Sequence, residues 1–371
     1  MSDFVVSARK YRPQTFDSVV GQSSITNTLK NSIKTDHLAQ AFLFCGTRGV
    51  GKTTTARILA KTINCMNRKE NIEACDECDS CKSFNEGQSL NIYELDAASN
   101  NSVDDIRALV DQVRIAPQLG NYKVYIIDEV HMLSPSAFNA FLKTLEEPPK
   151  HAIFILATTE KHKIIPTILS RCQIFDFHRI KVEDMVKHLE CIAKKEGVTV
   201  EQDGLTLIAQ KAEGGLRDAL SLFDQIVSST GGQLTYENVI LNLNILDYDY
   251  FFKLVEFMTS EDIPSAMLLY NEILERGFDG SNFLLGFAEH FRNLMICKDT
   301  KTHSMLEAGE KIKQKYLEQA ETLSLPFIMR ALGVISQVDV DYKASKNKRL
   351  LVEIGIMQLC SIKSEQEKKN P

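Results

Sequence analysis

The chain contains a glycine-rich segment whose spacing suits it to holding phosphate groups. The complete G-x-x-x-x-G-K-[ST] pattern consists of Gly46, Thr47, Arg48, Gly49, Val50, Gly51, Lys52 and Thr53, and Thr54 follows it. Glycines let backbone N–H groups point at phosphate oxygens, and the start of a following helix adds partial positive charge. In this pattern Lys52 reaches the β- and γ-phosphates and the Thr53 hydroxyl reaches Mg²⁺. The segment predicts binding of ATP or a related nucleotide together with Mg²⁺.

Two adjacent carboxylates extend this prediction from binding to hydrolysis. The apolar run 123–127 ends in Asp128 and Glu129, about 80 residues after the glycine-rich segment. At the end of a buried strand, Asp128 is placed to hold Mg²⁺, and Glu129 to act as the general base on an attacking water. Two solvated acids at a strand end are a common alternative. The position between helical segments, at this distance from the phosphate loop, favours the catalytic interpretation.

These side chains need a scaffold of alternating strands and helices. Strands are predicted at residues 41–45, 91–96, 123–128, 152–158 and 172–177. Helices are predicted between them, at 54–61, 102–115 and 135–145. Alternation with apolar strands predicts an α/β domain in which a parallel sheet is covered on both faces.

After residue 180 the sequence predicts helices and no further strands. Three short helices, at 182–196, 202–212 and 217–227, form a plausible helical lid. Beyond them, apolar side chains recur at helical spacing, and the first such stripe is Phe251, Leu254, Val255 and Met258. These stripes favour a bundle core, and a subunit interface is the alternative. The expected domains are 1–178 (P-loop ATPase), 179–241 (lid) and 242–363 (all-helical), with a disordered charged tail at 364–371.

Four of the nine cysteines are clustered. Cys65, Cys75, Cys78 and Cys81 are spaced C-x₉-C-x₂-C-x₂-C within the first domain. Paired x₂ spacing lets four thiolates converge on one ion, as a structural zinc site requires, and an iron–sulfur cluster is the main competitor. Because this segment is an insertion, its loss is expected to leave ATP binding largely intact. The other five, Cys45, Cys172, Cys191, Cys297 and Cys360, are expected to be buried as small apolar side chains.

Composition limits the class of protein. The chain has 371 residues, 44% of them hydrophobic and 25% charged, which is typical of a globular protein of two or three domains. No apolar stretch approaches the 18 residues of a membrane span, and the first ten residues lack a hydrophobic signal region, so we expect a cytoplasmic protein and no membrane partner. The net charge of −6 argues against a diffuse basic coat for nucleic acid, although a local basic surface remains compatible with it.

Taken together, the motifs resemble the gamma and tau ATPase subunits of bacterial DNA polymerase III clamp loaders, a branch of the AAA+ family. Besides the phosphate loop and the four-cysteine insertion, the matching segments are Lys10-Tyr11-Arg12-Pro13, Phe16-Asp17, Val20-Gly21-Gln22, Asp128-Glu129-Val130-His131-Met132-Leu133, Leu145-Glu146-Glu147-Pro148-Pro149, Ala157-Thr158-Thr159, Ser170-Arg171-Cys172 and Gly214-Gly215-Leu216-Arg217-Asp218. The resemblance implies an AAA+ domain with a five-stranded parallel sheet, a helical lid and an all-helical collar at 242–363.

The resemblance also implies roles for residues that the pattern alone leaves open. Tyr11, Arg12, Pro13 and Val20 would lie beside the adenine of ATP. Thr159 would be a sensor of the γ-phosphate or the attacking water; otherwise it is a β-branched residue ending a strand.

Two arginines gain roles in the same way. Arg171 resembles an arginine finger that acts on the ATP of a neighbouring subunit; the alternative is a surface arginine after a helix, and only the motif argues against it. Arg217 resembles a second sensor that joins the lid to the phosphates. Lys143 is a candidate phosphate contact on DNA, and a solvated lysine explains it about as well.

The implied function is an ATPase that loads a sliding clamp onto primed DNA within the DNA polymerase III holoenzyme. Its implied partners are other clamp-loader subunits in a ring of five, the clamp and primer–template DNA, and its cofactors are ATP, Mg²⁺ and Zn²⁺. Two alternatives are a different AAA+ DNA motor, either a helicase or a branch-migration enzyme, and a non-catalytic ring scaffold. The family's longer form carries further domains, which this sequence lacks, either naturally or because it is a piece of a longer chain.

Overall fold

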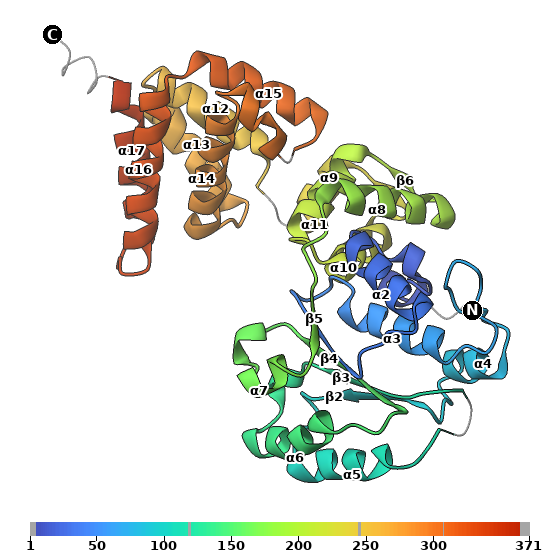
Figure 1. Ribbon diagram of the computed structural model, residues 1–371. Coiled ribbons are helices and arrows are strands. Elements are labelled where there is room, and N and C mark those ends of the chain that lie inside the picture. The colour runs from blue at the N-terminus through green and yellow to red at the C-terminus, as the bar shows by residue number, and fades with distance from the viewer. Residues whose placement is uncertain (1–4, 118–119, 244–245, 307, 364–371) are drawn as a thin grey trace. The chain divides into compact units, whose positions relative to one another are not determined.

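The computed structural model describes residues 5–117, 120–243, 246–306 and 308–363 (Figure 1). The predicted tail at 364–371 lies outside these residues. The chain divides into two compact units, one made of residues 1–196 and 208–225, the other of 197–207 and 226–371. The chain therefore passes from one unit to the other after Glu196, within α9 (Gln202–Lys211) and within α10 (Leu216–Thr230). The expected division at 178, 241 and 363 stays a prediction, and its second boundary falls within α11 (Tyr236–Leu243).

The first unit is built on a five-stranded parallel sheet, as predicted. Its strands are β1 (Ala41–Cys45), β2 (Ile92–Asp96), β3 (Lys123–Asp128), β4 (Ala152–Thr158) and β5 (Gln173–Asp176), in the spatial order β2-β3-β4-β1-β5. Every neighbouring pair is parallel. The continuous apolar runs of β1 and β4 are buried along their whole length, whereas β5 lies at an edge and buries only Phe175.

Each face of the sheet has its own hydrophobic core. Phe42 and Phe44 of β1 point into one core, together with side chains of α2 (Ser23–Lys34) and α3 (Lys52–Ile63). Leu43 points to the other face, where α5 (Val103–Val113) and α6 (Pro135–Glu146) pack (Figure 1). Alternation along one strand therefore places helices on both sides of the sheet, which fixes the strand ends relative to the helices that follow them.

Local signals mark the ends of several helices. Ser102 caps α5 by accepting from the Asp105 N–H, and Asp105 returns the contact in a capping box. Ser134 caps α6, which has Pro135 at its first position. The phosphate-loop helix begins at Lys52, two residues earlier than the predicted run, because Gly51 is its N-cap.

The sequence analysis assigned no structure to the segment before β1. It forms α1 (Ser7–Lys10), the short 3₁₀ turn η1 (Phe16–Ser18) and α2. We call residues 6–22 the N-terminal arm. Phe16 anchors this arm in the sheet core with 1% of its surface exposed.

The prediction that strands end at residue 180 is wrong. Thr199–Val200 (β6) and Gln233–Leu234 (β7) form a two-stranded parallel sheet in the second unit. Two residues cannot display the period of a strand, so only the preceding Gly197 and Gly232, both with positive φ, mark them. The helix α8 (Val182–Glu196) has the predicted bounds, α10 extends beyond its predicted end, and α11 was not predicted.

The rest of the second unit is helical. Its helices are α12 (Tyr248–Thr259), α13 (Ile263–Glu275), α14 (Gly280–Ile296), α15 (Glu310–Thr322), α16 (Leu325–Tyr342) and α17 (Lys348–Cys360), with the 3₁₀ segment η4 (Thr300–Met305). The stripe of Phe251, Leu254, Val255 and Met258 is buried in their common core, as the bundle interpretation predicts. No single helix in the described ranges is long and apolar enough to cross a membrane; α15 and α16 pass only as a pair, bent by 108°.

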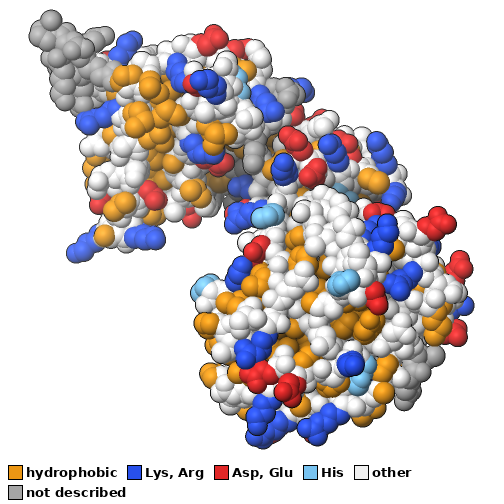
Figure 2. Space-filling model, in the orientation of Figure 1, with side chains coloured by type: hydrophobic (Ala, Val, Ile, Leu, Met, Phe, Trp, Pro, Cys, Tyr) orange, Lys and Arg blue, Asp and Glu red, His pale blue; other side chains and the backbone are white. Residues whose placement is uncertain are grey.

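Some apolar side chains of this unit face outward. Leu350, Ile354 and Met357 lie on α17 with 46%, 42% and 38% of their surface exposed. Their spacing of four and three residues places them on one side of the helix. Figure 2 shows apolar side chains among charged ones on the visible face of this unit. A helix that is apolar on both its core side and its outer side suits a surface that another chain covers.

The expectation of burial holds for some of the five scattered cysteines. Cys45, Cys297 and Cys360 are buried, but Cys172 is half-buried and Cys191 is exposed on α8. The buried side of α8 carries Met185 and Leu189, and Cys191 is not among the residues that share it.

One buried polar group of the sheet yields a stability prediction. Tyr125 of β3 is fully buried between Tyr93 and Phe154, and its hydroxyl has no hydrogen-bond partner in the described structure. Burying such a group costs free energy, so Tyr125→Phe should raise the free energy of unfolding of this unit by about 1 kcal/mol. Chemical denaturation measures this.

The matched control is Tyr316→Phe. Tyr316 is equally buried, but its hydroxyl is bonded to His290 Nδ1 at 3.1 Å, so the same substitution should destabilise the second unit. Destabilisation by Tyr125→Phe would show that its hydroxyl has a partner in solution.

Candidate functional site

The phosphate loop joins β1 to α3 and requires glycine at several positions. Gly46, Gly49 and Gly51 have φ values of 148°, 78° and 104°. A Cβ at Gly46 would lie 2.6 Å from the Phe177 carbonyl oxygen, so no larger residue fits there. The sequence therefore folds this loop tightly over the ends of β1 and β5, with the start of α3 directly behind it.

Lys52 is buried within this loop. Only 5% of its surface is exposed, and Nζ donates to the carbonyl oxygens of Gly46 at 2.7 Å and Thr47 at 2.8 Å. Burial lowers the pKa of Lys52, while the charges of Glu129 and Asp128 act in the opposite direction. An anionic ligand beside Nζ would add to their effect and stabilise the charged ammonium.

One short hydrogen bond joins the first turn of α3 to the last residue of β3. Thr53 Oγ1 donates to Asp128 Oδ2 at 2.6 Å, and Asp128 Oδ1 accepts the N–H of Glu129 at 2.9 Å. A hydroxyl and a carboxylate at this separation are oxygen donors that suit Mg²⁺ with phosphate as a further ligand. The predicted pair of Mg²⁺ ligands is thus together in the structure.

Glu129 is held in place by the end of β4. Its backbone has a left-handed φ of 47°, a conformation that costs a non-glycine residue of order 1–3 kcal/mol and is common at functional sites. Its Oε2 accepts the Thr159 hydroxyl at 2.9 Å and the Thr159 N–H at 3.2 Å, and His131 Nδ1 lies 3.4 Å away. Thr159 therefore contacts the candidate base directly, which sequence reasoning did not predict.

A pocket of about 610 Å³ lies beside the loop. Among the predicted residues it is lined by Tyr11, Arg12, Pro13, Val20, Arg48, Gly49, Val50, Gly51, Lys52, Thr53, Thr54, Asp128, Glu129 and Arg217. Gly46, Thr47, Thr159 and Arg171 are not among its lining residues. One wall is thus made of the N-terminal arm and another of the phosphate loop and the two carboxylates.

Positive charge gathers in this pocket. Arg12 Nε donates to Thr54 Oγ1 at 3.2 Å. Burial lowers the pKa of the Arg12 guanidinium, the charges of Arg57 and Arg217 lower it further, and those of Glu94 and Asp128 act in the opposite direction. Such a group of cations is stabilised by an anion, which matches a ligand that carries several phosphates.

The turn before α10 contacts the phosphate loop. Leu216 N donates to the Gly49 carbonyl oxygen at 3.0 Å, and a Cβ on Gly49 would lie 3.1 Å from Gly215 Cα. Gly214 has a φ of 86°, and a Cβ there would lie 2.5 Å from Arg179 Cβ. The two adjacent glycines therefore bring Arg217, the next residue but one, to the pocket wall.

Arg171 lies elsewhere on the same unit, just after α7 (Pro166–Leu169). Its guanidinium pairs with Glu146 Oε1 at 2.7 Å and donates to the Thr167 carbonyl oxygen at 2.7 Å. About a third of its side-chain surface is exposed, at 32%. The structure therefore separates Arg171 from the phosphate loop of its own chain and leaves it reachable from outside.

Sequence reasoning missed several residues of this site. Gln22 donates to the His178 carbonyl oxygen at 2.7 Å and to that of Val50 at 3.4 Å, so it links the loop to the chain after β5. Asp96 lies opposite Asp128 in the sheet register and lines the pocket, as does Leu216. An acid ending a strand was the available signal for Asp96, and the polar position in Val20-Gly21-Gln22 was the signal for Gln22.

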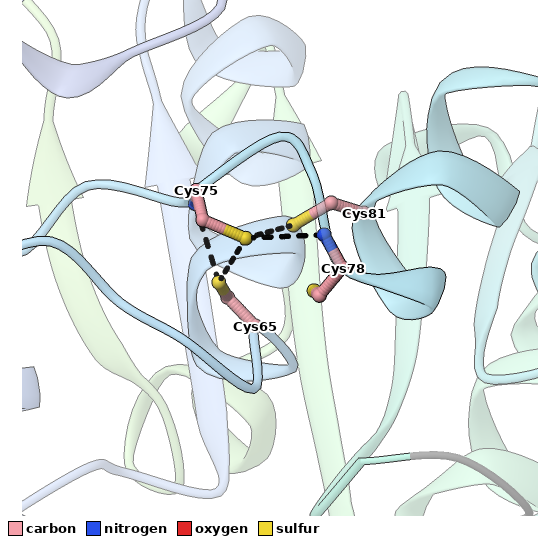
Figure 3. Close-up of side chains that lie close together, drawn as sticks. All are labelled: Cys65, Cys75, Cys78 and Cys81. Carbon is pink, nitrogen blue, oxygen red and sulfur yellow. Dashed lines mark hydrogen bonds between the residues drawn. The ribbon is translucent and has the colours of Figure 1, made fainter.

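The four clustered cysteines form a second candidate site, which runs from just after α3 to the first turn of α4 (Asp79–Asn85) and includes Cys81 within that helix. Their sulfurs all lie within 4.8 Å of one another, with 3.4 Å between those of Cys65 and Cys75 and 4.0 Å between those of Cys75 and Cys81 (Figure 3). Tetrahedral zinc with Zn–S bonds of about 2.3 Å places its sulfurs roughly 3.8 Å apart. Four convergent thiols at this spacing suggest zinc.

Backbone N–H groups stabilise the thiolate form of one of these cysteines, the form that binds a metal ion. Burial acts to raise the pKa of Cys75, but the N–H groups of Glu77 and Cys78 and the Cys65 thiol outweigh it and lower that pKa to about 6. The two N–H groups reach the sulfur at 3.4 Å and 3.3 Å. Such donors around a thiolate are the supporting interactions expected of a metal ligand.

Comparison with known protein families gives matches over three successive parts of the chain. Three family models match: "DNA polymerase III, delta subunit" over residues 21–181, "DNA polymerase III clamp loader subunit, ATPase lid domain" over 184–232, and "DNA polymerase III subunits gamma and tau domain III" over 237–370.

Individual relatives match most of the chain. It is 40% identical to DNA polymerase III subunit tau of Bacillus subtilis, over 95% of this chain and 62% of that protein. It is 46% identical to subunit tau of Escherichia coli, over 76% of this chain and 44% of that protein. It is 39% identical to DNA polymerase III subunit gamma of Buchnera aphidicola subsp. Baizongia pistaciae, over 84% of this chain and 86% of that protein. The chain thus spans about half the length of the tau subunits and most of the gamma subunit.

Metal analysis tests the cysteine site. The purified protein should contain about one zinc ion per chain, and Cys78→Ala should lower this content, because binding energies of roughly 10–16 kcal/mol depend on all four ligands. Cys191→Ala is the matched control, since that exposed cysteine lies outside the cluster. An absorbance band from iron in place of zinc would contradict the assignment.

Proposed function

Because the chain belongs to the family of DNA polymerase III gamma and tau subunits, we propose that it is an ATP-hydrolysing subunit of a clamp loader, which places a ring-shaped sliding clamp on primed DNA in the cytoplasm. The observation that carries the proposal is the continuous contact from Thr53 through Asp128 and Glu129 to Thr159, beside the buried Lys52. A protein that only bound nucleotide would need the loop but not this ordered set of groups behind it.

The two walls of the pocket suit the two halves of ATP. The N–H groups of the phosphate loop and the Lys52 ammonium bind the phosphates. Tyr11, Arg12, Pro13 and Val20 line the opposite wall and contact the adenosine. Arg217 approaches the phosphates from the lid side, so the turn at Gly214-Gly215 couples the bound nucleotide to the position of α10.

Hydrolysis needs a charge-balanced phosphate and an activated water. Thr53 and Asp128 would hold Mg²⁺, which would neutralise charge on the phosphates. Glu129 Oε accepts the proton of the attacking water as general base. Thr159 fixes the orientation of that carboxylate through its hydroxyl and its N–H.

Arg171 completes the site of a neighbouring subunit. It is exposed, lies outside its own pocket and is oriented by Glu146 and the end of α7. Presented to the γ-phosphate of an adjacent chain, the guanidinium stabilises the negative charge that develops during transfer. Hydrolysis then depends on assembly.

The second unit supplies the assembly. The exposed apolar row of Leu350, Ile354 and Met357 on α17 supports a subunit contact in the collar predicted at 242–363. We propose a ring of five with other clamp-loader subunits, with the sliding clamp and primer–template DNA as partners. The inner side of α17 is packed in the core of this unit, so the helix is already fixed before any partner binds.

The decisive measurement is ATP turnover alone, with primed DNA, and with primed DNA plus clamp. A clamp loader accelerates only when both are present, a DNA motor accelerates on DNA without a clamp, and a scaffold does not turn over. Lack of stimulation by the clamp in the assembled complex would overturn the proposal.

Two substitutions separate binding from chemistry. Lys52→Ala removes the ammonium that balances phosphate charge and should abolish ATP binding. Glu129→Gln keeps the shape and the Asp128 ligand, so it should bind ATP normally while hydrolysis falls by about 10²–10⁴. Equilibrium binding and steady-state turnover give the two values, and turnover of Glu129→Gln at the rate of the unsubstituted chain would refute the role of the base.

Action of Arg171 across a subunit boundary predicts complementation. Arg171→Ala should leave ATP affinity nearly intact and lower stimulated turnover of the assembled complex by about 10³-fold or more. Arg276→Ala is the control, because that arginine is also exposed and paired with a glutamate, at 2.9 Å, but lies in the helical unit. Complexes that mix Arg171→Ala and Lys52→Ala chains should regain activity that neither variant has alone. Absence of recovery in verified mixed complexes would mean that Arg171 acts within its own chain or not at all.

A further inference from the structure

A buried carboxylate connects the four-cysteine insertion to the N-terminal arm. Glu73 has only 3% of its surface exposed. Its Oε2 accepts the N–H of Phe16 at 3.0 Å, and its Oε1 accepts the N–H of Asp17 at 3.1 Å. Lys30 of α2 completes the arrangement with Nζ 2.8 Å from Oε1. The three contacts of this carboxylate are thus directed at the arm and at the helix that follows it.

The arm that Glu73 holds is one wall of the nucleotide pocket. Glu73 binds the arm at η1, and pocket-lining residues lie on both sides of that turn: Val6, Ala8, Arg9, Tyr11, Arg12 and Pro13 before it, Val19 and Val20 after it. Since the phosphate loop forms the other wall, the arm faces the nucleoside part of a bound nucleotide. Moving η1 would move both halves of this wall.

Glu73 is close in sequence to the candidate metal ligands. It lies two residues before Cys75, in the loop 66–74 that joins Cys65 to Cys75. The residue before it, Ile72, has a φ of 62°, and Asp76 has a φ of 65°. A left-handed conformation is a marked outlier for a β-branched residue and persists only where the surroundings fix it. Closing the loop through a shared metal ion is such a constraint.

A second contact joins the insertion to the phosphate-loop helix. Lys61 of α3 is 98% buried and pairs with Asp76 Oδ1 at 2.6 Å. Asn85 Nδ2 also reaches this oxygen, at 3.2 Å. Asp76 follows Cys75 directly, so one short stretch of chain, 73–76, contacts both α3 and the arm. The insertion therefore joins the arm to the C-terminal part of the helix that follows the phosphate loop.

We propose that the four-cysteine insertion positions the adenosine-binding wall of the pocket: with metal on its cysteines, Glu73 holds the N-terminal arm against the nucleotide. This inference rests on the proposed binding of ATP and of zinc. It replaces the expectation from sequence that loss of the insertion leaves ATP binding largely intact. Glu73 is a positioning residue, since it contacts the arm and not the pocket.

Ligand selectivity tests this role in the full chain. Dissociation constants are measured by calorimetry for Mg²⁺–ATP and for Mg²⁺–tripolyphosphate, which lacks the nucleoside. Glu73→Gln should weaken ATP binding about tenfold, since it removes a charged hydrogen-bond acceptor, and should change tripolyphosphate binding less than about twofold. Glu70→Gln is the matched control, an exposed carboxylate in the same loop. Zinc content should stay the same in both variants. Equal loss for the two ligands, or no loss relative to the control, would overturn the proposal.

Removal of zinc gives a second, variant-independent measurement. Chelation of the unsubstituted protein should weaken ATP binding by a similar factor and leave tripolyphosphate binding intact, with circular dichroism reporting whether the helices persist. Chelation of Glu73→Gln should add little, because both changes interrupt the same connection. A full additional loss would mean that metal and Glu73 act separately, and an unchanged ATP affinity after verified zinc loss would refute the inference even if Glu73→Gln fails to fold.

The outcomes distinguish this inference from the proposed function. If the unsubstituted protein bound neither ATP nor tripolyphosphate, the proposed ATPase function itself would fall. If it bound both, with zinc present, and chelation changed neither affinity, only the positioning role of Glu73 would fall.

Discussion

Parallel pairing brings the carboxyl ends of β1, β3 and β4 to one edge of the sheet, and the reactive side chains follow those ends. The phosphate loop leaves β1, Asp128 and Glu129 end β3, and Thr159 follows β4. Because β4 lies between β1 and β3, Thr159 can reach Glu129 while Thr53 reaches Asp128. A one-residue shift in the register of β3 would reverse the direction of its side chains and separate these pairs.

Buried charge is the second constraint, and the molecule meets it with specific partners. Lys52, Lys61 and Glu73 are each at least 95% buried. An unpaired charge at such positions would cost several kcal/mol, so each is matched by carbonyl oxygens, a carboxylate or backbone N–H groups. These pairings link the phosphate loop, its helix and the arm into one polar framework. Phe16 of the arm and the inner side of α3 pack in the same hydrophobic core, on one face of the sheet.

Patterns that are local in sequence were predicted well. The strands β1, β3 and β4 have the predicted bounds because they are buried on both faces and read as uninterrupted apolar runs. The phosphate loop and the cysteine cluster follow from spacing alone. Contacts between distant segments were missed: Glu73 reaches Phe16 across 57 residues, and Gln22 reaches His178 across 156. No periodicity marks such residues, and a single buried glutamate looks like a solvated one in sequence.

The ion pair between Arg171 and Glu146 bears on the proposed action of this arginine on a neighbouring chain. The side chains of Arg171 and Glu146 are 32% and 50% exposed, so solvent and salt screen the attraction between their charges. Ion pairs of this kind contribute only about 0–1 kcal/mol. In the proposed assembly, Arg171 would give up this ion pair at little cost in free energy, while also losing its hydrogen bond to the Thr167 carbonyl oxygen. Because the pair is partly exposed, its strength depends on ionic strength, and added salt should weaken the hold of Glu146 on Arg171.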